Sequence, residues 1–272
     1  MFTLQGVARE LSGVAIVLVL LLLVSFLPPD TSLSEVEASH ALRACVPTAY
    51  PPLVTGDPAR PGVDVEILQA VARYIGVELV LNPSYAIGQD FNPANWDINR
   101  GKCAILAGGV VDTTLTRSFL DTGPPYAEMG WAVLAPAALK DVKGRTFGVL
   151  TILSGLDRIG LASYLRSQGA TVRVVRDAPA LVAGIASGMF DGGVTESLIA
   201  AQLAADNKWW FAFAPPVLPR YNLVFGLWKG DLTLKRKVVG AFHQLESDGT
   251  IAATLKRYGL GALGEEGSVP SL

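Results

Sequence analysis

The sequence predicts an α/β fold built from two successive units. The chain has 272 residues, of which 50% are hydrophobic and 17% charged, enough for one sizeable core or two smaller ones. Short apolar runs alternate with stretches of helical periodicity, as expected for helices packed on mainly parallel sheets. This alternation occurs twice along the chain. We therefore expect two α/β lobes.

The first unit is predicted to begin at residue 42. Its expected strands are Leu42–Val46, Val77–Leu81, Cys103–Ala107 and Gly130–Ala135, and its expected helix is Asp64–Ile75. The helix places apolar side chains at intervals of three and four residues, which predicts one buried face.

The second unit repeats this order. It is predicted to contain strands at Arg145–Leu150, Thr171–Val175 and Asp191–Thr195 and helices at Gly155–Gln168 and Ala178–Ser187. A helical tail over 231–258 follows and is expected to return to the first lobe. The chain then crosses between lobes twice, near 135–139 and 221–225, and such crossings act as hinges. This organisation assigns 42–135 and 225–262 to lobe 1, 136–224 to lobe 2 and 263–272 to a flexible tail.

Residues 1–41 are predicted to contain a targeting segment and a polar tether. The run Gly13–Leu27 is apolar and carries no charge. A signal peptide needs a small-residue cleavage site, but Pro28, Pro29 and Asp30 follow the run. An uncleaved anchor over residues 11–27 would be near the ~17-residue lower limit for a membrane span. Both alternatives imply export, and both remain open at this point.

Charge and composition exclude several function classes. The net charge is −2, so no basic field exists to attract nucleic acid. The two histidines, His40 and His243, and the two cysteines, Cys45 and Cys103, do not reproduce a zinc-ligand spacing. No metal or cofactor is expected. In an exported chain an even pair of cysteines favours a disulfide, the alternative being two buried free thiols.

Five segments in a fixed order form a recognisable pattern: TAYPPL at 48–53, GVDVE at 62–66, NRGKCAILAGG with DTGPPY between 99 and 126, DVKGRTFGV at 141–149 and LESDGTIAATLKRYG at 245–259. Together they resemble the extracellular solute-binding protein family 3, the polar amino-acid receptors of ABC importers. The resemblance implies a two-lobed periplasmic-binding-protein type II fold with a ligand cleft between the lobes and two hinge crossings. In that fold the first and third strands are neighbours, which would bring Cys45 and Cys103 within the ~4.4–6.8 Å Cα separation of a disulfide.

The resemblance also implies a ligand site. Glu196 stands where the family carries the carboxylate for the ligand ammonium, and Tyr50 would form an aromatic wall beneath the ligand. Gly109 would present its backbone to the ligand. Ser154 matches a hydroxyl position in the loop before a lobe 2 helix, where it would also cap that helix.

The expected carboxylate clamp departs from the family pattern. The family places an arginine three residues after a threonine that matches Thr113, but this chain has Thr116 at that place and Arg117 one residue later. A local one-residue shift would restore a bidentate clamp. Without it the clamp is lost, because threonine cannot replace arginine there.

The resemblance implies an exported, periplasmic protein that captures a small polar ligand, an amino acid or a related solute. It would deliver this ligand by lobe closure to an ABC permease in the inner membrane, with membrane contact of its own only through an uncleaved N-terminal segment. It would perform no chemistry. Two alternatives are a membrane-tethered accessory or sensor module with a degenerate site, and a cyclohexadienyl-dehydratase-like enzyme in which Glu196 acts as the acid or base.

Overall fold

The computed structural model describes residues 13–20, 22, 29–88, 90–151 and 155–264. Residues 1–31 and 32–272 form two separate compact units. In the first unit, residues 13–20 and 22 are helical. None of the helices in the described part of the chain has the length and apolar composition needed to cross a bilayer. In these described ranges, every buried side chain belongs to Ser32 or a later residue, so the core of the described part of the chain lies after residue 31.

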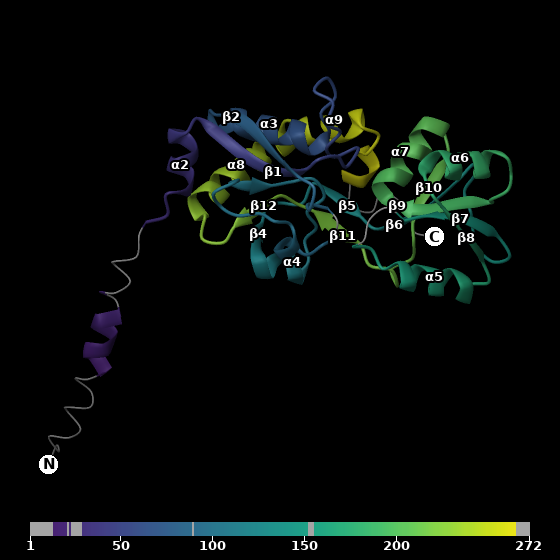
Figure 1. The fold of residues 1–272 in the computed structure, drawn as a ribbon, viewed down its shortest axis with the longest axis horizontal. Helices are drawn as coiled ribbons and strands as arrows, with labels where there is room; N and C mark the ends of the chain where they lie inside the picture. Colours follow the sequence, from purple (N-terminus) through teal and green to yellow (C-terminus); the bar gives the residue numbers. More distant parts are fainter. Residues whose placement is uncertain (1–12, 21, 23–28, 89, 152–154, 265–272) are drawn as a thin grey trace, which may run out of the picture. The chain divides into compact units, whose positions relative to one another are not determined.

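The first lobe is built on a five-stranded sheet with the strand order β2-β1-β3-β12-β4 (Figure 1). Its strands are β1 (Ala41–Pro47), β2 (Glu78–Ser84), β3 (Ile105–Leu106), β4 (Leu120–Thr122) and β12 (Gly226–Trp228). The first three are parallel, whereas β12 runs antiparallel to both β3 and β4. The main helices of this lobe are α3 (Val63–Ile75), α4 (Thr114–Phe119), α8 (Leu232–Ser247) and α9 (Thr250–Arg257).

Helix α3 shows how the sequence sets these elements. Apolar side chains spaced three and four residues apart, including Ile67, Leu68 and Val71, are fully buried. Gly76 ends the helix in the left-handed conformation, with φ of 91°, and its N–H is donated to the carbonyls of the last turn. This is the usual glycine termination.

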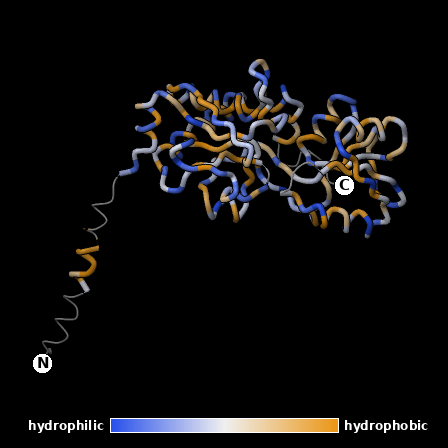
Figure 2. The backbone as a smooth tube through the Cα atoms, viewed as in Figure 1, coloured by the Kyte–Doolittle hydropathy of each residue, from blue (hydrophilic) through white to orange (hydrophobic). Residues whose placement is uncertain are grey.

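The second lobe is built on a five-stranded sheet with the order β10-β6-β9-β7-β8. Its strands are β6 (Trp131–Ala135), β7 (Thr146–Leu150), β8 (Thr171–Val175), β9 (Gly192–Glu196) and β10 (Trp210–Phe213), and its helices are α5 (Arg158–Ser167), α6 (Ala178–Ala186) and α7 (Ser197–Asn207). Hydrophobic residues gather along the strands in both lobes (Figure 2).

The strand over 131–135 does not belong to the first lobe, where the sequence analysis placed it. Strand β6 pairs antiparallel with β9 and β10 of the second sheet, and all five of its residues are buried. The first crossing is therefore at β5 (Ala127–Met129) and the residue that follows, not at 135–139. Strand β5 pairs antiparallel with β11 (Tyr221–Leu223), which is the second crossing.

Both ends of the first lobe also differ from the prediction. Residues Ser32–Ala38 form helix α2 rather than a tether. This helix packs on α8: Val36 is buried, and the Ser32 and Thr233 hydroxyls are hydrogen-bonded at 3.0 Å. At the other end, Leu263 is buried in the 3₁₀ turn η2 (Gly261–Gly264) and is not part of a flexible tail. Residues 265–272 lie outside the described ranges.

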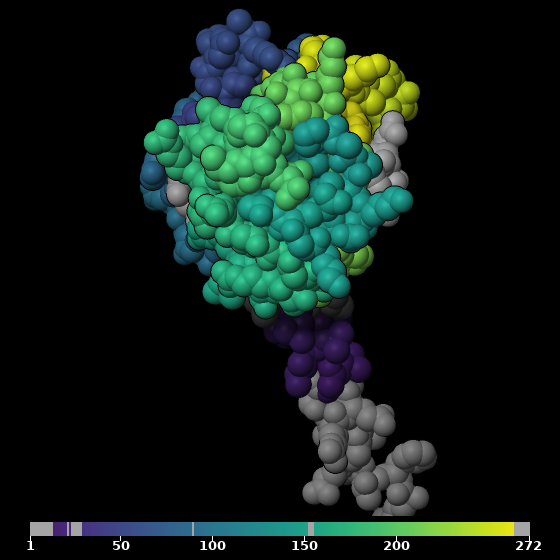
Figure 3. Space-filling view, turned by 90° about the vertical axis from the view of Figure 1, so that its right-hand side faces the viewer, coloured from purple at the N-terminus to yellow at the C-terminus, as the bar shows by residue number. Residues whose placement is uncertain are grey.

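The lobes also meet through α7 and the C-terminal segment. A Cβ built on Gly259 would lie 3.6 Å from the Ala205 side chain of α7. In Figure 3 the green surface of α7 accordingly borders the yellow surface of the C-terminal residues. The two lobes are therefore in contact at α7 as well as through the two crossing strands.

Candidate functional site

Glu196 lies at the last position of β9, directly before α7. Its backbone position is fixed from both sides: the Ser197 N–H donates to the Gly130 carbonyl at 2.8 Å, and the Gly130 N–H donates to the Ser197 hydroxyl at 3.2 Å. Across the ladder, Trp131 is directly opposite Glu196, so the two side chains project from the same face of the sheet.

The Glu196 carboxylate joins the two lobes. The Tyr50 hydroxyl of lobe 1 donates to Glu196 Oε2 at 2.7 Å, and the Glu196 side chain is only 2% exposed. Burial raises the pKa of Glu196 to about 7, an effect that the hydrogen bond from Tyr50 partly opposes. No positively charged side chain in the described ranges contributes to this pKa shift.

The second carboxylate oxygen has an unmet hydrogen-bonding capacity. Glu196 Oε1 is buried and has no hydrogen-bond partner, and the same holds for the hydroxyl of the adjacent Thr195. A buried acceptor without a partner is costly, and such groups are normally paired. Glu196 can therefore accept a hydrogen bond from a cationic group placed between the lobes without giving up Tyr50.

Gly109 lies against the Tyr50 ring. Its φ is +92°, and a Cβ built on it would come within 2.7 Å of Tyr50 Cε1. Gly108 is restricted in the same way by Pro47, whose Cδ would lie 2.0 Å from an added Cβ. Glycine is needed at both positions because only it combines this backbone conformation with so close an approach. The predicted Tyr50 and Gly109 are thus in contact.

Asp64 holds this glycine pair and was not among the predicted site residues. It is fully buried at the start of α3, accepts the Gly108 N–H at 2.6 Å and accepts the Tyr126 hydroxyl at 2.6 Å. Burial raises the pKa of Asp64 to about 6, against the lowering effects of Tyr126 and of the Gly108 and Gly109 N–H groups. Asp64 lies within the GVDVE segment, so the sequence did mark this position. An acidic residue at the start of a helix is not in itself a sign of a binding site.

Thr113 caps α4 and Arg117 lies within it, and neither forms a hydrogen bond or an ion pair with Glu196. The Thr113 hydroxyl caps the helix by accepting the Thr116 N–H at 3.0 Å. Arg117 Nε lies 3.3 Å from Asp112 Oδ1, and its side chain is 59% exposed. Thr116, which occupies the position of the family arginine, is fully buried.

Arg117 instead lines a polar hollow of about 580 Å³ next to the crossing strands. The hollow also contains Arg220, whose guanidinium lies 3.6 Å from Glu128 and 4.1 Å from the Phe213 ring centroid. Its lining residues include neither Tyr50 nor Glu196. Arg117 thus faces Asp112 and this hollow, and a carboxylate clamp formed by Arg117 stays a prediction.

Ser154 lies outside the described residues, but its predicted role as helix cap is wrong. Helix α5 begins at Arg158, and its N-cap is Asp157, whose carboxylate accepts the Gly160 N–H at 2.8 Å. Gly155 precedes this cap and contacts lobe 1: a Cβ built there would lie 2.3 Å from the Phe91 ring.

Sequence reasoning missed Phe91. Its ring also packs edge-on against Tyr221 of β11 with centroids 5.4 Å apart. No motif marked Phe91, because it lies in an irregular connection rich in proline and asparagine.

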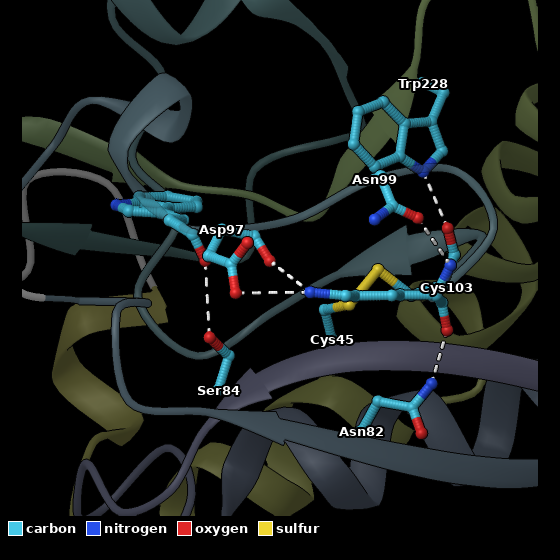
Figure 4. The surroundings of a disulfide bond; sticks show 9 residues. Cys45, Asn82, Ser84, Asp97, Asn99, Cys103 and Trp228 are labelled. Atoms are coloured by element: carbon cyan, nitrogen blue, oxygen red, sulfur yellow. Dashed lines mark hydrogen bonds and ion pairs between the residues drawn. A yellow bond between two sulfur atoms is a disulfide. The ribbon is translucent and has the colours of Figure 1, made fainter.

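The predicted disulfide is present. Cys45 and Cys103 are bonded with a Cα separation of 5.5 Å, and both are buried. In Figure 4 the bond is flanked by Trp228, whose indole N–H donates to the Cys103 carbonyl at 2.7 Å, and by Asn82. The bridge ties β1 to the segment entering β3. Within the described residues, no three His, Cys, Asp or Glu side chains are grouped to hold a metal ion.

Comparisons with known proteins agree with this architecture. A sequence profile of the bacterial extracellular solute-binding proteins, family 3, matches residues 42–261. The L-cystine-binding protein TcyJ of Escherichia coli (strain K12) is 25% identical, with 92% of this chain and 94% of that protein covered.

Solved structures show the same fold. The ancestral cationic amino acid solute-binding protein AncCDT-1 has a TM-score of 0.70 at 23% identity, covering 84% of this chain and 99% of that one. The L-cystine solute receptor of Neisseria gonorrhoeae, in its unliganded open conformation, has a TM-score of 0.68 at 16% identity, covering 86% and 99%. With the profile spanning both lobes, the chain belongs to the bacterial extracellular solute-binding proteins of family 3.

Proposed function

We propose that this protein is exported and captures a small solute carrying an ammonium group, an amino acid or a related compound, between its lobes. The observation that carries the proposal is the Glu196 carboxylate, which is buried at the lobe interface with Oε1 unpartnered. An ammonium group supplies both the charge and the hydrogen-bond donors that this oxygen lacks. Relatives named for binding L-cystine and cationic amino acids support this class of ligand.

The same proposal includes delivery of the solute to an ABC permease in the inner membrane. The solute would bridge Glu196 of lobe 2 and the Tyr50–Gly109 wall of lobe 1, so that binding favours the closed arrangement of the lobes. A permease that recognises the closed form then distinguishes the loaded protein from the free one. Residues 1–31 would serve for export, as a cleaved signal peptide or as an anchor.

A dehydratase-like reaction is less well supported than binding, because Glu196 and Tyr50 together provide a single group with a pKa near neutral. One solved neighbour is described as a precursor of cyclohexadienyl dehydratase, and a likeness of this kind concerns the fold. General acid–base catalysis works best when the groups titrate near the working pH. Burial raises the pKa of Tyr50 well above its ordinary value. Of the hydrogen-bonded pair Tyr50 and Glu196, only Glu196 therefore exchanges a proton near neutral pH.

A thermal-shift screen of residues 32–272 tests the proposal. The panel contains amino acids, amines, polyamines and small carboxylates. A solute at a hundred times its dissociation constant stabilises the native state by about 2.7 kcal/mol, which raises Tm measurably. We expect hits only among compounds with an ammonium group, and at least tenfold weaker binding of those hits to Glu196→Gln. Stabilisation by carboxylates alone, or equal affinity of the variant, would contradict the proposal.

A further inference from the structure

We propose that the cleft selects an organic amine that has no carboxylate beside its ammonium group. This inference rests on the proposed function and narrows the class of solute. Its basis is an asymmetry between the two lobes: Glu196 offers an unpartnered anionic acceptor, whereas the groups of the facing wall that would hold an anion are engaged within lobe 1.

The cation-binding side of the proposed site is the Glu196 carboxylate. It is 2% exposed and retains a free acceptor in Oε1. Two aromatic residues belong to this region: Tyr50, whose hydroxyl donates to Oε2, and Trp131, whose side chain projects from the same face of the sheet as Glu196. A carboxylate combined with aromatic rings is the usual environment for an organic cation.

The backbone groups suited to an anion are already used. The Gly108 N–H, next to the glycine that contacts Tyr50, donates to the buried Asp64 carboxylate at 2.6 Å, and the Gly109 N–H lowers the pKa of the same carboxyl. Asp64 thus takes the Gly108 N–H that a ligand carboxylate would need at this wall.

In the described part of lobe 1, the side chains suited to an anion are used too. The Thr113 hydroxyl accepts the Thr116 N–H and is hydrogen-bonded to the Thr116 hydroxyl at 3.0 Å. The residues between the glycines and α4 include Val110 and Val111, which are buried and have no polar side-chain atom. Arg117 is paired with Asp112 beside a hollow whose lining does not include Glu196.

An α-amino acid held by Glu196 would therefore carry its own carboxylate into an unfavourable place. The carboxylate is attached two bonds from the ammonium nitrogen, so it would be buried close to Glu196. No positive side chain in the described ranges contributes to the electrostatics of Glu196. An unpaired buried charge next to a like charge is strongly penalised. An amine without that carboxylate makes the same contact with Oε1 and avoids the penalty.

Isothermal titration of residues 32–272 with pairs of compounds that differ only in the carboxylate tests this selection. The pairs are cystamine and L-cystine, 1,5-diaminopentane and L-lysine, and phenethylamine and L-phenylalanine. We expect the amine of the best-binding pair to bind at least tenfold more tightly than its amino acid. Glu196→Gln should weaken the amine at least tenfold. Glu78→Gln, which changes an exposed carboxylate at the start of β2, should leave its affinity unchanged.

The possible outcomes separate this inference from the proposed function. If an amino acid binds as tightly as its amine or more tightly, and Glu196→Gln weakens it, the inference is wrong and the proposed function stands. A simultaneous loss of amino-acid binding in Arg117→Ala would identify the clamp that the inference denies. If amines and amino acids bind with equal affinity to the wild type and to Glu196→Gln, or none binds, the proposed function fails as well.

Discussion

Replacement of Glu196 by glutamine should remove the pH dependence that this residue gives to the stability of the ligand-free protein. Burial raises the folded-state pKa of Glu196 from 4.5 to about 7, so the folded state binds a proton more tightly than the unfolded chain. The corresponding stabilisation is fully present below pH ~4.5 and is lost as the pH rises through about 7. At about 1.4 kcal/mol per pKa unit, the full effect is on the order of 3 kcal/mol.

Urea unfolding of residues 32–272 at pH 5 and pH 8 measures this effect. Asp64, whose pKa is raised to about 6, also makes the free energy of unfolding fall as the pH rises. This contribution is present in both proteins and cancels in the comparison. The glutamine side chain still accepts the Tyr50 hydrogen bond and carries no charge. We expect Glu196→Gln to gain about 2–3 kcal/mol relative to wild type between pH 5 and pH 8. If the free energy of unfolding changes equally in wild type and Glu196→Gln between pH 5 and pH 8, Glu196 is not a desolvated carboxylate.

Three further changes test the supporting structure. Tyr126→Phe removes the hydroxyl that donates to Asp64. It should lower the free energy of unfolding by about 1–3 kcal/mol at pH 8, and by less at pH 5, where Asp64 is protonated. An equal loss at both pH values would show that the charge of Asp64 plays no part. Gly62→Ala should cost at least about 2 kcal/mol by urea unfolding, because φ is +112° and the new Cβ would lie 2.3 Å from the Leu53 carbonyl oxygen; Gly188→Ala, with positive φ and no neighbour within 4 Å, should cost about 1 kcal/mol. Reduction of the disulfide should lower stability by about 2–4 kcal/mol, and an unchanged urea midpoint in reductant would contradict a structural role.

The elements with a strong periodic pattern could be predicted from the sequence. Helix α3 and strand β8 lie within one residue of their expected bounds, because spacing and a terminal glycine report directly on local structure. Strand β6 was found but assigned to the wrong lobe. All five of its residues are buried, and such a pattern does not say which neighbours a strand pairs with. The pairing of β6 with β9 and β10 shows that the chain crosses between the lobes before β6.

Some of the candidate site residues do lie together, for similar reasons. Tyr50, Gly109 and Glu196 come together because each lies next to a regular element whose position was predicted correctly. Arg117 does not join them, since its orientation depends on the turn of α4 and on a local partner, Asp112. Phe91 contacts the other lobe from an irregular connection, and no sequence pattern predicts such a contact.

A crystal structure of residues 32–272 with the tightest-binding compound of the matched pairs would show whether Glu196 holds the solute between the lobes. We expect an ammonium nitrogen at hydrogen-bond distance, about 2.7–3.2 Å, from Glu196 Oε1, with the Tyr50 ring against the solute. A solute bound in the hollow lined by Arg117 and Arg220, with Glu196 Oε1 still unpartnered, would contradict it.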